Sequence, residues 1–123
     1  MVKELQPMVT FFAGTYPYQV RINLWYRQDY LEFECVGGTH PHVGAVAYGD
    51  EHVELLYQFP DHKEGELLRS LIKKVQKASG SIVVGSCGIH VDNATWEEIQ
   101  LLVHHAERCG EEMERFLFYK EKA

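Results

Sequence analysis

The sequence predicts an α+β fold in which an antiparallel-rich sheet carries two helices packed on one face. The first half of the chain alternates apolar and polar residues with a period of two, which is typical of half-buried strands. The second half repeats apolar residues every three to four positions, which indicates amphipathic helices. The 123 residues contain no linker, repeat or low-complexity tract, so we expect a single domain over residues 1–123.

The strands are expected as one short segment followed by two hairpins. Gln28 and Asp29 are polar and separate two strictly alternating runs, which predicts the first turn. The turn of the second hairpin is expected at residues 49–51. The predicted strand segments are residues 8–12, 20–27, 31–35, 43–48 and 53–59.

The first helix has one apolar stripe and recognisable ends. Asp61 is placed to cap its start, and Glu64 three residues later resembles a capping box. Gly80 is suited to the left-handed residue that ends a helix. Residues 81–84 then predict a short strand, and residues 85–91 an irregular segment. The stripe consists of Leu67, Leu68, Leu71, Ile72 and Val75.

The last helix is expected to start near Thr95, which forms a T-x-x-E capping box with Glu98. A stripe of methionine, aliphatic and aromatic residues at this spacing indicates core packing and not contact with a cofactor. The expected buried face consists of Ile99, Leu102, Val103, Ala106, Met113, Phe116 and Leu117.

Composition and charge exclude several classes of function. The net charge of −6 disfavours nucleic-acid binding, because phosphate backbones select basic surfaces. No apolar run reaches the ~18 residues of a membrane span, and the N-terminus lacks a signal-peptide pattern, so we expect a cytoplasmic protein. Three cysteines cannot all pair within one chain, and buried free thiols are expected at Cys35, Cys87 and Cys109.

The common nucleotide-binding, zinc-protease and serine-hydrolase motifs are absent, but residues 37–44 form an unusual loop. Gly37 and Gly38 allow a ligand to approach backbone N–H groups, and such amide clusters bind phosphates. Pro41 favours an extended chain around it, in which His40 and His42 point the same way. A rigid loop whose histidines cap backbone groups explains the same residues.

Two further segments carry histidines at the ends of elements. His62 lies in residues 59–62, before the first helix, where helix capping with a surface histidine is the alternative. His90 lies in residues 88–92 and points away from Ile89 and Val91, which favour the core. If His42, His62 and His90 converge, they could hold a divalent metal with one open position, or orient the polar edge of a flat ligand. We interpret His52, His104 and His105 as solvated.

These three segments resemble the prenylated-flavin chaperone family of LpdD-like proteins, which is typified by a small accessory protein of gallate decarboxylase. The family pattern GGT-x-PH-x-G, then F-P-x-H, then GIHV with a nearby Thr, matches residues 37–44, 59–62 and 88–91 with Thr95. The resemblance covers about residues 33 to 117. His40 stands where the family residue varies. The resemblance carries over Gly37, Gly38, Thr39, His42, Gly44, His62 and His90 as cofactor-binding candidates.

The resemblance implies a non-catalytic accessory protein that binds prenylated flavin mononucleotide (prenylated FMN) and delivers it to a UbiD-type decarboxylase. The amides of Gly37, Gly38 and Thr39 are then expected to bind the flavin phosphate, with the aromatic-rich sheet as a wall for the ring. One alternative is a metal-dependent hydrolase or lyase built on His42, His62 and His90. A third is a structural decarboxylase subunit, favoured by an exposed apolar patch at Trp25, Leu56 or the end of the last helix. The sequence leaves the partner's substrate and a homo-oligomeric state open.

Overall fold

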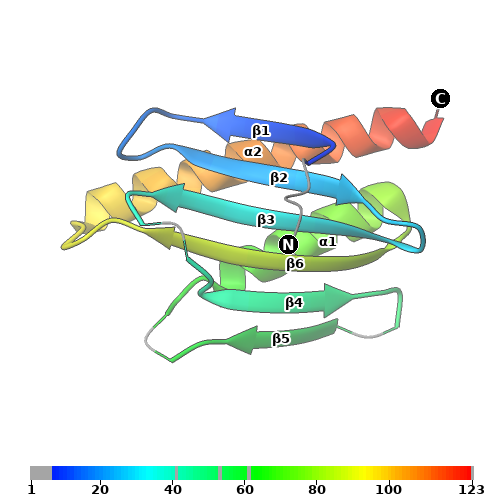
Figure 1. Ribbon diagram of the computed structural model, residues 1–123, viewed down its shortest axis with the longest axis horizontal. Coiled ribbons are helices and arrows are strands. Elements are labelled where there is room, and N and C mark those ends of the chain that lie inside the picture. Colours follow the sequence, from blue (N-terminus) through cyan, green and yellow to red (C-terminus); the bar gives the residue numbers. More distant parts are fainter. Residues whose placement is uncertain (1–6, 41, 53, 61, 123) are drawn as a thin grey trace, which may run out of the picture.

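The computed structural model describes residues 7–40, 42–52, 54–60 and 62–122, and these form one six-stranded sheet with two helices (Figure 1). Both helices lie on the same face of the sheet, so the predicted α+β architecture is confirmed. The strands are β1 (Val9–Ala13), β2 (Val20–Tyr26), β3 (Tyr30–Gly38), β4 (Ala45–Gly49), β5 (Glu54–Gln58) and β6 (Ile82–His90). The helices are α1 (Gly65–Ser79) and α2 (Trp96–Lys122).

Strand β6 lies inside the sheet, although it is the last strand in the sequence. The strand order is β1-β2-β3-β6-β4-β5, and every neighbouring pair is antiparallel except β3 and β6. The register of this parallel pair places Cys35 opposite Cys87 and Gly38 opposite His90. Because β3 and β6 run in the same direction, their carboxyl ends lie side by side at the same end of the sheet.

The predicted hairpins are confirmed as the pairs β2–β3 and β4–β5. In the second turn, the carboxylate of Asp50 accepts hydrogen bonds from the Tyr48 hydroxyl (2.9 Å) and the His52 backbone N–H (2.7 Å). Val53, expected to begin the second strand of this hairpin, lies outside the described residues.

Strand β6 is longer than the sequence indicates, because its glycines suit a packed central strand. The segment 85–91 was expected to be irregular, yet residues up to His90 pair with β3. A β-carbon at Gly85 would lie 2.6 Å from Cζ of Phe33. A glycine therefore gives the Phe33 ring room on the helix-covered face, and the glycines that predicted a loop are packing positions instead.

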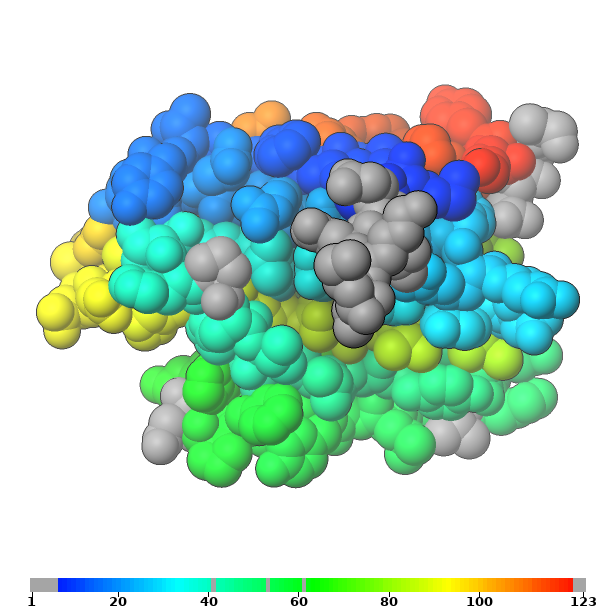
Figure 2. Space-filling model, in the orientation of Figure 1, coloured from blue at the N-terminus to red at the C-terminus, as the bar shows by residue number. Residues whose placement is uncertain are grey.

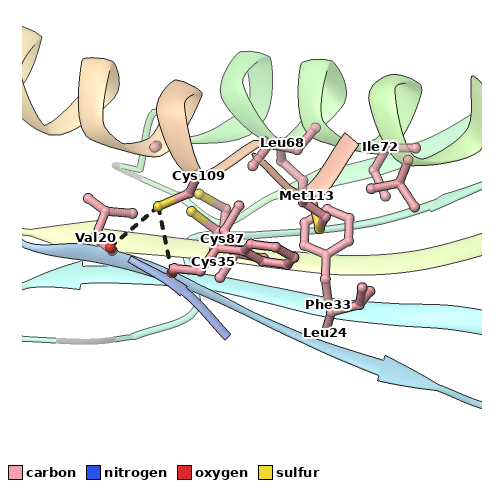
Figure 3. Close-up of a cluster of buried hydrophobic side chains, with 14 of the residues drawn as sticks. Val20, Leu24, Phe33, Cys35, Leu68, Ile72, Cys87, Cys109 and Met113 are labelled. Atoms are coloured by element: carbon pink, nitrogen blue, oxygen red, sulfur yellow. Dashed lines mark hydrogen bonds between the residues drawn. The ribbon is translucent and has the colours of Figure 1, made fainter. Parts of the chain in front are cut away.

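The core fills the space between the helices and one face of the sheet (Figure 3). Alternate strand residues point into it, as the two-residue period predicts. The first helical stripe is confirmed, with Leu67 only partly buried. The largest fully buried side chains are Phe33, Ile22, Leu24, Leu68, Leu71, Ile72, Met113, Leu117, Val20, Val75, Val83 and Cys35.

The three predicted helix boundaries can be compared with the structure. Gly80 is left-handed (φ 68°) and ends α1, and the Thr95–Glu98 capping box forms with bonds of 2.9 and 3.1 Å. The start of α1 differs, because Glu64 is its N-cap residue and makes no side-chain capping bond. The prediction that Glu64 completes a capping box from within the first turn is therefore wrong. Asp61, the other residue of the predicted box, lies outside the described residues.

Helix α2 departs from its predicted face at two residues. Ile99 was expected in the core but is 46% exposed, because the first turns of α2 lie beside the strand ends (Figure 1). His105 was interpreted as solvated, but its Nδ1–H donates to the Tyr18 carbonyl (2.7 Å) and its ring lies against Gly14. His52 and His104 are exposed as predicted. Neither described helix has the length and apolar content that a membrane span requires.

The three cysteines are free and buried, as predicted. The Cys109 thiol reaches from α2 toward the carbonyl oxygen of Val20 (3.5 Å), as Figure 3 shows, and toward that of Phe11 (3.7 Å). Burial raises the pKa of Cys109 to about 12, and the hydrogen bond with Cys87 followed by burial raises that of Cys35. The thiols of Cys35 and Cys109 are therefore protonated near neutral pH.

Candidate functional site

Four histidine side chains, His40, His42, His62 and His90, lie together at one end of the sheet, and we call them the histidine cluster. The ring centroid of His42 lies 4.9 Å from that of His62 and 5.7 Å from that of His90. The rings of His40 and His90 are 6.0 Å apart. The structure thus brings together the three segments that the sequence singled out, although they are widely separated along the chain.

The parallel pairing of β3 and β6 positions two of these segments. The Thr39 backbone N–H donates to the carbonyl of His90 (2.9 Å), which ties the end of β3 to the end of β6. The Gly44 N–H donates to the carbonyl of Cys87 (2.8 Å) and brings the chain back to β6. The loop from Thr39 to Val43 is therefore held over β6 at both ends. Pro41, expected to stiffen this loop, lies outside the described residues.

Gly88 provides the space for this loop. A β-carbon at Gly88 would lie 1.5 Å from the carbonyl oxygen of His42 and 3.0 Å from the backbone nitrogen of Val43. No side chain fits at that distance, so the loop can rest on β6 only where the strand has a glycine. Gly38 has a similar role, since its β-carbon would lie 2.1 Å from the His90 carbonyl oxygen and its φ is +79°.

The β4–β5 hairpin brings in His62. The Phe59 N–H donates to the Gly44 carbonyl (2.9 Å), and the His62 N–H donates to the Phe59 carbonyl (3.2 Å). This places the turn after β5 beside the start of β4. The Nδ1–H of His62 donates to the Pro60 carbonyl (2.8 Å), which fixes the ring and leaves Nε2 without that bond.

His42 is more enclosed than His40 and His90. Its Nδ1–H donates to the His40 carbonyl (3.0 Å). Its Nε2 is buried and lies 3.3 Å from Oε1 of Glu64, without the alignment of a hydrogen bond. Both ring nitrogens of His42 therefore face oxygen atoms. Gly44 allows this approach, because a β-carbon there would lie 2.3 Å from Oε2 of Glu64.

His90 and His40 share a carboxylate at the rim of the histidine cluster. The Nε2–H of His90 donates to Oδ1 of Asp92 (2.8 Å), and Nδ1 of His40 lies 3.8 Å from Oδ2 of the same residue. His90 points away from the core, as predicted from its position between Ile89 and Val91. These exposed rings can change their partners more readily than His42 can.

A groove of about 260 Å³ opens beside His42 on the face of the sheet that the helices leave uncovered, the face seen in Figure 2. Val36 on this face is only 8% exposed, because the loop carrying His42 and Val43 lies beside it. The groove is lined by Arg21, Glu34, Val36, His42, Val43 and Ser86. It has a cation, a carboxylate, a hydroxyl, an imidazole and two apolar walls.

Sequence reasoning missed most of these groove residues. The two-residue period does indicate that Arg21 and Glu34 face away from the core. It cannot show that β6, with Ser86, lies next to β3, because that depends on the strand order. Glu64 was missed as a neighbour of His42, because it was interpreted as part of a helix cap.

The expectation that the glycine turn offers free amides to a phosphate is wrong. The Gly38 N–H donates to the Gln19 carbonyl (3.1 Å), and those of Thr39 and His40 donate to the His90 carbonyl (2.9 and 3.4 Å). Gly37 and Gly38 instead allow close packing, since a β-carbon on Gly37 would lie 2.8 Å from the Gln19 oxygen. An anion at this site therefore requires other donors.

Among the described residues, no group of three or more His, Cys, Asp and Glu side chains is arranged to hold a metal ion. One ring nitrogen of each histidine is already bonded within the chain. His42 bonds to the His40 carbonyl, His62 to the Pro60 carbonyl, and His90 to the Asp92 carboxylate. Metal binding by these three histidines stays a prediction.

A larger cavity of about 400 Å³ lies on the helix layer, away from the histidine cluster. Its walls are polar and charged side chains, and no aliphatic or aromatic residue lines it. The groove on the open face of the sheet, in contrast, has Val36 and Val43 in its walls. The cavity on the helices is lined by Glu66, Arg69, Ser70, Lys73, Lys74, Lys77 and Glu114.

A small α+β protein with a histidine cluster beside an open groove has the features of a ligand-binding protein. Comparison with protein families gives a match over residues 14–117 to the family described as the prenylated flavin chaperone LpdD-like domain. The chain belongs to this family, and the resemblance seen in the sequence is confirmed. The family description names a chaperone, which implies an accessory role. No curated protein matched the chain.

Proposed function

We propose that this protein binds prenylated FMN at the histidine cluster and the adjoining groove, and delivers it to a UbiD-type decarboxylase. The observation that carries the proposal is the convergence of His42, His62 and His90 beside an open groove. Membership of the prenylated flavin chaperone family supports the choice of ligand. The cofactor-binding candidates Gly37, Gly38, Thr39, His42, Gly44, His62 and His90 all lie in the segments that build this region.

The chemistry of the region suits one part of a flavin. Val36 and Val43 supply apolar walls for a flat ring, while imidazoles can donate to or accept from its polar edge. Small-molecule pockets commonly enclose about 300–1,000 Å³. A groove of about 260 Å³ therefore covers only part of the cofactor. Partial coverage suits a carrier, because the exposed remainder is available to the recipient.

The open face of the sheet extends the apolar wall beyond the groove. Val46 on β4 and Leu55, Tyr57 and Phe59 on or after β5 are between 38% and 63% exposed. This surface supports both contact with the ring and contact with a recipient protein. Of the positions expected to form the patch of a structural subunit, Leu56 packs against the core, whereas Phe118 and Tyr119 at the end of α2 are 47% and 70% exposed.

The proposal is tested by co-purification and by transfer. Purified protein mixed with prenylated FMN should retain the flavin absorbance through gel filtration, and the loaded protein should activate apo-decarboxylase. The His42→Ala/His90→Ala variant should lose both properties, whereas His52→Ala, an exposed histidine in the β4–β5 turn, should keep them. No retention by the unmodified protein, together with no activation of the decarboxylase, would defeat the proposal.

The same variants, together with a metal analysis, separate the two alternatives from the proposal. A structural subunit should still support its decarboxylase when His42 and His90 are replaced by alanine. A metal-dependent hydrolase or lyase should hold stoichiometric metal after stripping and reloading, as measured by elemental analysis. If metal-stripped protein still retains the flavin, the histidines do not bind it through a metal, and the metal-dependent enzyme is excluded as the basis of binding.

A further inference from the structure

We propose that Arg21, and not the glycine turn, binds the phosphate of the flavin mononucleotide. This inference rests on the proposed function and assigns the anionic end of the ligand to one side chain. Arg21 lies on β2, opposite Val36 on β3, with its side chain on the open face. It lines the same groove as His42, so one ligand can reach both residues.

The charge of Arg21 is available to a ligand. Two other arginines are neutralised, since Arg27 pairs with Glu32 (3.0 Å) and Arg69 pairs with Glu54 (2.8 Å). Arg21 forms no such ion pair with a carboxylate within the described part of the chain. A guanidinium presents paired donors that match phosphate oxygens and bind them in a bidentate manner.

Glu34, the carboxylate in the groove, is held by a chain of hydrogen bonds across three strands. The Thr10 hydroxyl donates to Oδ1 of Asn23 (2.8 Å), and Nδ2 of Asn23 donates to Oε1 of Glu34 (2.8 Å). Asn23 is only 9% exposed, so this chain is an ordered part of the sheet. The hydrogen bond from Asn23 satisfies one oxygen of Glu34. Arg21 takes no part in this network, so its guanidinium can bind an anionic group of a ligand.

The strand order defines where the phosphate would lie. Arg21 on β2 lies opposite Val36, whereas Ser86 on β6 lies opposite Glu34, the neighbouring residue on the same face of β3. A phosphate above Val36 would accept from the guanidinium of Arg21. The backbone amides of Gly38, Thr39 and His40 are already bonded within the chain, which leaves Arg21 as the principal donor.

The test compares prenylated FMN with its dephosphorylated form, prepared by phosphatase treatment. Dissociation constants for both ligands are measured by flavin fluorescence for the unmodified protein, Arg21→Gln and Arg108→Gln. The last variant removes the same charge from an exposed residue of α2 and is the matched control. Because a hydrogen bond to a charged group contributes about 1.5–3 kcal/mol, the unmodified protein should prefer the phosphorylated form by about 10- to 100-fold.

Arg21→Gln should abolish that preference by weakening only the phosphorylated ligand, and Arg108→Gln should preserve it. Arg21→Lys should give an intermediate preference, because a lysine keeps the charge but not the paired donors. The inference is overturned if Arg21→Gln keeps the full preference, or if it weakens both ligands equally. Binding of neither form by unmodified protein would defeat the proposed function as well. Circular dichroism of each variant checks that the fold is intact.

Discussion

The carbonyl oxygen of His42 lies where a β-carbon of Gly88 would be, at a separation of only 1.5 Å. This contact fixes the height of the loop above β6, and with it the position of the His42 ring between those of His62 and His90. The geometry of the histidine cluster thus depends on a residue that has no side chain. A glycine in a central strand weakens the strand, so its presence here is explained by the loop that it admits.

Replacing Gly88 by alanine should therefore displace the loop and disorder the histidine cluster. We expect the free energy of unfolding to fall by about 1–3 kcal/mol or more, as in overpacked sites, and flavin retention to be lost. Urea denaturation and gel filtration with prenylated FMN measure the two effects. Val84→Ala, on the same face of the same strand but 38% exposed, is the control. A Gly88→Ala protein with unchanged stability and binding would contradict this account.

Local sequence patterns predicted the elements well where burial alone determines them. The alternation in residues 20–27 follows the open and covered faces of the sheet, and Gly80 and Thr95 mark helix ends. The failures share one cause. Gly85 and Gly88 resemble loop residues, yet they are glycines because Phe33 and the His42 carbonyl occupy the space of their side chains. Such contacts join residues far apart in sequence and leave no local periodicity.

The candidate site was predictable in its histidines but not in its groove. His42, His62 and His90 stand beside Gly, Pro or Asp at element ends, a position that indicates display by a scaffold. Arg21 carries no such mark, since an arginine in an alternating strand resembles any solvated residue. Its relation to Ser86 follows from the insertion of β6 beside β3, which the sequence does not reveal.

Glu98 should make stability depend on pH in the acid range. The Thr95 backbone N–H, and then the hydroxyl groups of Tyr18 and Thr95, lower the pKa of Glu98 below its ordinary value of 4.5. The contribution of a carboxylate with a lowered pKa is present above that ordinary value and is lost as the pH falls through the folded-state pKa. Urea denaturation between pH 3 and 7 should show Glu98→Gln less stable near neutrality and equal to the unmodified protein at the acid end. A difference that stays constant with pH would argue against this ionisation.

The three thiols should resist modification in the folded protein. The thiolate is the reactive form, and the raised pKa of Cys109, about 12, makes it scarce near neutral pH. Cys35, whose pKa is also raised, and Cys87 are both fully buried. A chromogenic disulfide reagent at pH 8 should find no fast-reacting thiol in native protein and all three of Cys35, Cys87 and Cys109 in urea. Rapid labelling of the native protein would show that the core opens readily.

Two phenylalanines on the sheet should differ sharply in their contribution to stability. Phe33 on β3 faces the helices and is 1% exposed, whereas Phe12 on β1 faces away and is 54% exposed. Phe33→Ala leaves a cavity between the sheet and helix α1, so we expect a loss of about 3–5 kcal/mol in the free energy of unfolding. Phe12→Ala should cost less than about 1 kcal/mol, because its ring already contacts water. Urea denaturation of both variants measures the difference, and equal losses would contradict the assignment of the open face of the sheet.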